Sequence, residues 1–74
     1  MANEVKWWRA KPPYLIGRID WFDRARAYPG RELKRPRLRG TVRLFRDVDA
    51  FERENVSFSI DVPLAWLDEV DAPK

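Results

Sequence analysis

The stretch RARAYPGRELKRPRLRGTVRLFR, residues 24–46, decides the fold, because it joins a long loop to a strand. Residues 23–39 are predicted to form a turn-rich loop, since Pro29-Gly30 is a strong turn signal. Residues 40–46 are predicted to form a strand, because Val42 and Leu44 alternate with residues that belong to the other face. A basic loop is therefore expected to lead directly into a sheet.

The chain after this stretch predicts one more strand and two short helical segments. Residues 55–62, NVSFSIDV, place apolar side chains at every second position, the pattern of a strand with one buried face. The acidic connection before it has Ala50 and Phe51 as a possible helical turn over one end of the core. Residues 63–69 are predicted to be a short C-terminal helix, because proline is tolerated at its first position and apolar residues recur every third position.

The chain before it predicts two further strands. Residues 4–9, EVKWWR, are short and aromatic, which favours a strand, and alternation then requires Trp7 and Trp8 to lie on opposite faces. Two prolines end this strand. Residues 14–22, YLIGRIDWF, are predicted to be the second strand, with an apolar face toward the core and a bend at Gly17.

These elements define the expected fold class. The 74 residues have room for a single small β domain, residues 1–74. We expect a mainly β structure, a small antiparallel sheet or partly open barrel of four to five strands with a short C-terminal helix. An open sheet of this size has edges to protect, so a homodimer or a protein partner is an open alternative.

The composition points away from catalysis. The chain has no cysteine and no histidine, which removes thiolate chemistry and the usual general base near neutral pH. The few hydroxyl side chains besides tyrosine, Thr41, Ser57 and Ser59, have no histidine to activate them. We therefore expect no enzyme activity, no cofactor and no metal. The acidic residues 47–54 lack the spacing of a calcium loop and are interpreted as a solvated turn.

No segment is apolar enough for a signal peptide or a membrane span, so the expectation is a cytoplasmic protein with no membrane partner.

Charge is distributed unevenly along the chain. Residues 1–46 hold 13 basic and 4 acidic residues, and residues 47–74 hold 2 basic and 8 acidic residues. Arginine-rich loops bind phosphate groups, and aromatic side chains beside them offer stacking platforms for bases. The first hypothesis is a non-catalytic nucleic-acid-binding module, RNA in the first place, with Trp8 or Tyr28 stacking on bases. The candidate binding residues are Arg24, Arg26, Tyr28, Arg31, Lys34, Arg35, Arg37, Arg39 and Arg43.

Two alternatives remain open at this point. The same surface would suit an acidic protein partner, and the chain would then be an adaptor or a small subunit. Alternatively, Arg37, Arg39 and Arg43 pair with the acidic segment 47–54 and bind nothing.

One part of the chain resembles a known family. Gly30-Arg31, followed by Pro36-Arg37-Leu38-Arg39-Gly40 and then by Leu44-Phe45-Arg46, is similar to the C-terminal β-barrel of elongation factor Tu. The resemblance covers Leu15 to Asp47. It departs from the family at Thr41-Val42, where the family has Tyr-Arg-Pro, and in a longer gap before Pro36. It implies a translation-related, six-stranded barrel whose surface contacts RNA or protein, without GTP hydrolysis.

Overall fold

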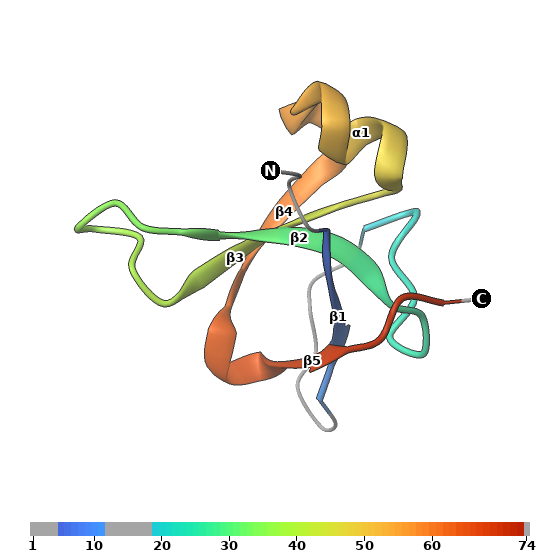
Figure 1. Ribbon diagram of the computed structural model, residues 1–74, viewed down its shortest axis with the longest axis horizontal. Coiled ribbons are helices and arrows are strands. Elements are labelled where there is room, and N and C mark those ends of the chain that lie inside the picture. Colours follow the sequence, from blue (N-terminus) through green and yellow to red (C-terminus); the bar gives the residue numbers. More distant parts are fainter. Residues whose placement is uncertain (1–4, 12–18, 74) are drawn as a thin grey trace.

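The chain forms one antiparallel sheet, and the expected fold class is confirmed. Figure 1 shows the computed structural model, which describes residues 5–11 and 19–73. The sheet has the strand order β4-β3-β2-β1-β5. The elements are β1 Lys6–Ala10, β2 Tyr28–Leu33, β3 Thr41–Phe45, α1 Val48–Arg53, the 3-10 turn η1 Val56–Phe58, β4 Ser59–Pro63, the 3-10 turn η2 Leu64–Trp66 and β5 Leu67–Val70. No helix in these described ranges is long and apolar enough to cross a membrane.

Strand β2 is the element that the sequence assigned wrongly to a loop. Its first half pairs with β1, as in Trp8↔Tyr28, and its second half pairs with β3, as in Leu33↔Thr41. Pro29 lies in the half that pairs with β1 alone. A strand paired on one side is the setting that proline tolerates. The predicted turn at Pro29-Gly30 is therefore a strand, which divides the predicted loop into residues 23–27 before β2 and residues 34–40 after it.

Gly30 is the point where β2 changes partners. It is in register with Lys6 of β1 and with Leu44 of β3. A methyl group at its Cα would lie 2.8 Å from Leu44 Cδ2, 2.8 Å from Trp8 Cδ1 and 2.9 Å from Val42 Cγ1. Core side chains from both neighbouring strands thus occupy the space that a side chain would need.

Substituting Gly30 with alanine should therefore destabilise the fold. Overpacking a closed core costs roughly 1–3 kcal/mol, and we expect Gly30→Ala to lower the free energy of unfolding by that amount. Urea unfolding followed by tryptophan fluorescence measures it. The control is Gly40→Asn, because Gly40 has φ +83° with open space around its Cα, and asparagine tolerates that backbone region. Equal stability of Gly30→Ala and wild type would contradict the packing described for this bend.

The main core lies on one face of the sheet. Its buried residues are Trp8, Ala10, Tyr28, Val42, Leu44, Val62 and Leu67. The prediction that Val42 and Leu44 face the core is confirmed, since both are fully buried. The two adjacent tryptophans do lie on opposite faces: Trp8 is 3% exposed, whereas Trp7 is half-buried.

A second, smaller core explains why the other face of the sheet is also covered. Phe45 and Phe51 pack edge to face, with ring centres 5.5 Å apart, beside buried Ala50. Helix α1 brings two of these residues onto β3, so the predicted helical turn at Ala50 and Phe51 is confirmed. Asp47 precedes helix α1 as its N-cap, and its Oδ1 accepts a hydrogen bond of 2.8 Å from the N–H of Ala50.

The predicted strand over residues 14–22 is wrong where it can be examined. Residues 12–18 lie outside the described part. Residues 19–22 form a turn, in which the N–H of Phe22 donates to the carbonyl of Ile19 at 3.0 Å. Trp21 and Phe22 pack on Tyr28, with ring centres 5.6 and 5.1 Å from its ring. These two aromatic side chains are thus partly buried against the core although they lie in a loop and not in a strand.

The last third of the chain also differs from the expected pattern. The N–H of Ser57 donates to the side chain of Asn55 at 3.2 Å, which starts a 3-10 turn where the alternation predicted strand. Val56 is consequently 58% exposed, and only the second half of the segment 55–62 enters β4. The predicted C-terminal helix is a single 3-10 turn, η2, followed by β5. Strand β5 covers the outer edge of β1 and buries Leu67 there.

Candidate functional site

The hairpin loop, defined here as residues 34–40, projects from the sheet between β2 and β3 (Figure 1). Its turn is closed by the N–H of Leu38, which donates to the carbonyl of Arg35 at 2.9 Å. Pro36 occupies the second position of this turn, where its fixed φ is favourable. Gly40 then takes a left-handed φ of +83° and returns the chain to β3. The sequence thus builds a defined loop that extends away from both cores.

Four basic side chains belong to this loop. They are Lys34, Arg35, Arg37 and Arg39, and all four are exposed. None of them forms an ion pair with any acid in the described ranges 5–11 and 19–73. The acids that form ion pairs lie elsewhere on the surface, and Glu32, at the base of the loop, pairs with none of the four cations. The fold therefore presents a concentrated positive charge to solvent.

The arginines of the strands behave differently. Arg43 on β3 donates two hydrogen bonds to the carboxylate of Asp61 on β4, at 2.8 and 3.3 Å. These hydrogen bonds raise the pKa of Arg43 above its ordinary value, against a smaller opposing effect of burial. Arg31 on β2 donates to Glu54 at 2.8 Å, and its guanidinium lies 4.9 Å from the ring centre of Phe51. Both arginines are thus already neutralised within the fold.

The alternative that Arg37, Arg39 and Arg43 pair with the acidic segment 47–54 is wrong. Arg43 pairs with Asp61, outside that segment, and the two loop arginines pair with no acid of the described chain. The segment does neutralise one candidate, Arg31, through Glu54. The ion pair between Arg43 and Asp61 could have been predicted from the sequence. Both residues lie on strands that the pattern predicts, and antiparallel pairing of these strands places the two side chains opposite each other.

Arg24 and Arg26 do not join the loop. They precede β2, whereas the hairpin loop follows it, so the two groups lie at opposite ends of that strand (Figure 1). The guanidinium of Arg26 covers the Tyr28 ring at 5.1 Å from its centre. Arg24 is exposed beside Arg9 on the rim of a shallow hollow. The nine candidate residues therefore do not form one face.

The aromatic residues proposed for base stacking are not on the surface. Tyr28 is completely buried, and its hydroxyl accepts from the N–H of Asp23 at 2.7 Å and donates to the carbonyl of Trp21 at 3.1 Å. Trp8 and Phe45 are each 3% exposed. Stacking by Tyr28 or Trp8 is therefore incompatible with their positions in the core. The partly exposed aromatic side chain Phe58 lies under Arg46, whose guanidinium is 3.8 Å from the ring centre.

Three of the four acidic residues in the segment 47–54 have structural roles. Asp47 caps α1, Asp49 pairs with Arg53 four residues later, and Glu54 pairs with Arg31. Within residues 5–11 and 19–73, no three acidic side chains come close enough together to hold a metal ion. The segment anchors α1 and one strand arginine.

The cap at Asp47 should make part of the stability depend on pH. The N–H of Ala50 lowers the pKa of Asp47 below its ordinary value of 3.8, and Arg46 lowers it further. Because the folded pKa lies below the unfolded one, the stabilisation is present above about pH 4 and is lost as the pH falls through the folded pKa. We expect Asp47→Ala to cost about 1 kcal/mol of unfolding free energy at pH 7, and less at pH 2. Urea unfolding at both pH values measures the difference.

The matched control for this prediction is Asp47→Asn. Asparagine keeps an oxygen acceptor for the N–H of Ala50 but carries no charge, so the stability of this variant relative to Asp47→Ala should be the same at pH 2 and at pH 7. A cost of Asp47→Ala that is the same at pH 2 as at pH 7 would show that the carboxylate does not carry the cap.

Comparison with known proteins finds no relative for this chain. No family model matches it, and neither the curated proteins nor the solved structures include a significant match. The argument for function therefore rests on the surface itself.

Proposed function

We propose that this chain is a non-catalytic nucleic-acid-binding module whose hairpin loop contacts the phosphate backbone of RNA. One observation carries the proposal: Lys34, Arg35, Arg37 and Arg39 stay exposed and without an ion pair in the described part of the chain. They lie within six residues on a loop that projects from the sheet (Figure 1). The candidate interface is thus smaller than the basic stretch of the sequence.

The physical basis is the release of counterions. Each cation that neutralises a phosphate releases ions condensed on the nucleic acid, and the resulting gain in entropy favours binding. Arg31 and Arg43 contribute less, because each would first have to leave Glu54 or Asp61. Arg24 and Arg26 lie beyond the other end of β2 and are not included.

A titration at two salt concentrations tests the proposal. With four phosphate contacts, the slope of log K against log salt is expected to be about −2.8 for single strands, at about −0.7 per contact. Raising the salt from about 50 to about 200 mM should then weaken binding about fiftyfold. Fluorescence anisotropy with labelled single- and double-stranded RNA measures this. Absence of binding at the lower salt concentration, or binding that salt does not weaken, would reject the proposal.

A second candidate function is docking to an acidic protein. Its support is a hollow of about 310 Å³ on the sheet face, where apolar side chains lie beside Arg35, which forms no ion pair in the described part of the chain. The hollow also includes Arg31, paired with Glu54, and Arg43, paired with Asp61. The apolar contributors are Leu33, Leu38, Phe45 and Val56. This alternative predicts a copurifying partner or a concentration-dependent oligomer. A monomer by sedimentation that captures nothing in a pull-down would count against it.

The resemblance to the translation-factor barrel belongs to the first proposal. If that proposal holds, a translation-related role in the cytoplasm is its natural extension.

A further inference from the structure

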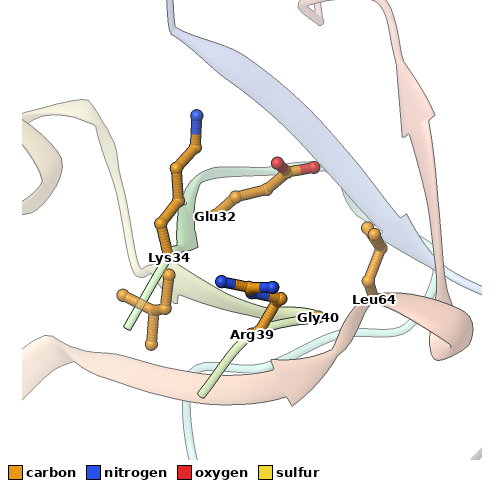
Figure 2. Close-up of a pocket in the computed structure, with 6 residues that line it drawn as sticks. Glu32, Lys34, Arg39, Gly40 and Leu64 are labelled. Carbon is orange, nitrogen blue, oxygen red and sulfur yellow. The ribbon is translucent and has the colours of Figure 1, made fainter. Parts of the chain in front are cut away.

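A hollow of about 360 Å³ lies at the base of the hairpin loop, where three elements meet (Figure 2). The end of β2 provides Glu32, the loop provides Arg39, and η2 provides Leu64. The N–H of Leu64 donates to the carbonyl of Gly40 at 2.6 Å, which holds η2 against the loop. The volume lies within the range of small-molecule pockets, roughly 300–1,000 Å³.

The chemistry of this hollow is mixed. Its lining is Glu32, Leu33, Lys34, Arg39, Gly40 and Leu64. Leu64 offers apolar contact, the two cations offer donors for phosphate, and the carboxylate offers acceptors, whereas the side chain of Leu33 follows that of Glu32 on β2 and points to the other face of the sheet. A site for phosphate alone would not include a carboxylate, because the two anions repel each other. The lining instead suits a ligand that combines a phosphate, an apolar surface and N–H donors, as a nucleotide does.

Glu32 is the acid of this hollow. It is the single acid in residues 24–46, it is exposed, and its carboxylate forms no ion pair in the described part of the chain. Figure 2 shows its side chain beside the same opening as Arg39 and Leu64, with Lys34 next to it. Both oxygens of the carboxylate are thus available to a ligand.

Guanine is the base that fits two adjacent acceptors. Its Watson–Crick edge carries two neighbouring donors, the N1–H and the N2 amino group, so one carboxylate accepts from both. The other bases place a carbonyl or a ring nitrogen lone pair next to their donor, which a carboxylate repels. In a duplex these donors are already paired, so the guanine must be unpaired, as in single-stranded RNA.

We propose that this hollow binds one unpaired guanine of a single-stranded RNA, with Glu32 accepting from its Watson–Crick edge, Leu64 contacting the ring, and Lys34 and Arg39 contacting adjacent phosphates. This inference rests on the proposed function, to which it adds base preference. The loop supplies affinity that is independent of sequence, and Glu32 supplies discrimination.

The test compares 11-nucleotide uridine RNAs that differ only in the central base. Anisotropy titrations at about 50 mM salt are made with central guanosine, inosine, adenosine, cytidine and uridine. We expect guanosine to bind on the order of tenfold more tightly than uridine. Inosine lacks the amino donor and should fall between them. Glu32→Gln should remove the preference while raising the affinity for the all-uridine RNA, because one negative charge is lost.

The control is Glu52→Gln, which changes the net charge equally at an exposed position on α1. It should keep the guanosine preference. Binding of all five RNAs with equal affinity would overturn the guanine site and leave the proposed function standing, whereas no binding of any RNA would reject the proposed function itself. A guanosine preference that survives in Glu32→Gln would also overturn the role given to Glu32.

Discussion

Replacing Arg35, Arg37 and Arg39 together with glutamine should weaken binding to single-stranded RNA by about 10²- to 10³-fold at ~50 mM salt. The three side chains are exposed and pair with no acid in the described ranges, so the fold should lose nothing. Three of four expected phosphate contacts disappear, and the salt slope should fall from about −2.8 to about −0.7. Anisotropy titrations across a salt series measure both quantities.

The matched control removes three positive charges from positions outside the hairpin loop. Lys6, Arg9 and Arg24 are exposed, form no ion pair in the described part of the chain, and lie outside the hairpin loop. Replacing these three with glutamine should leave most of the affinity. If both triple variants lose affinity equally, net charge and not the loop determines binding. If the loop variant binds as wild type does, the loop is not the interface.

Tyr28→Ala should cost about 3–5 kcal/mol of unfolding free energy, because it empties the most enclosed aromatic position of the core. A chain of this length has a total stability of roughly 4–11 kcal/mol, at about 0.05–0.15 kcal/mol per residue. The variant should therefore be largely unfolded or close to it. Circular dichroism and urea unfolding measure this directly.

Tyr28→Phe separates the ring from the hydroxyl. It keeps the contacts with Trp21 and Phe22 but leaves the N–H of Asp23 without its acceptor, so we expect a loss of about 1–2 kcal/mol. Because Tyr28 is buried, the affinity for RNA should not change. A folded Tyr28→Phe variant with altered RNA affinity would place this residue in the interface, contrary to the structure. Unchanged stability would show that the hydroxyl bridge contributes nothing.

The local sequence pattern predicted correctly those elements whose burial in the fold matches the pattern. The strand over residues 40–46 and the helical turn at Ala50 and Phe51 were found because alternation and spacing matched the burial that the fold provides. The strand predicted for residues 55–58 is wrong, because the side chain of Asn55 accepts a hydrogen bond from the N–H of Ser57. This hydrogen bond starts a 3-10 turn in place of a strand. The helix predicted for residues 63–69 is wrong in its second half, because pairing of β5 with β1 outweighs the helical spacing of the apolar residues.

The prediction of a turn at Pro29-Gly30 is wrong for a different reason. Both residues signal a turn locally, but here proline lies in the part of β2 that pairs with β1 alone, and glycine lies where two strands bring their side chains together. Only the three-dimensional pairing distinguishes this bend from a turn. Sequence pattern has no access to that pairing.

The basic residues show the same division between local and long-range information. The sequence identified the basic stretch, but register decided which members are neutralised, since Arg43 faces Asp61 across the sheet and Arg31 reaches Glu54. The hairpin loop is left with its charge because it extends past the sheet. Glu32, the single acid of the stretch, lines a hollow with the loop and η2, and this neighbourhood is not visible in the sequence pattern.

The most direct test of the central claim is nuclear magnetic resonance mapping of the RNA contact. The ¹⁵N-labelled chain is titrated with single-stranded uridine RNA at low salt, and shifts are followed for backbone amides and arginine Nε–H groups. The account predicts that the largest shifts occur in residues 34–40 and at Arg35, Arg37 and Arg39, with little change at residues 24–27. Shifts concentrated at residues 24–27 or on α1, or the absence of any shift, would contradict it.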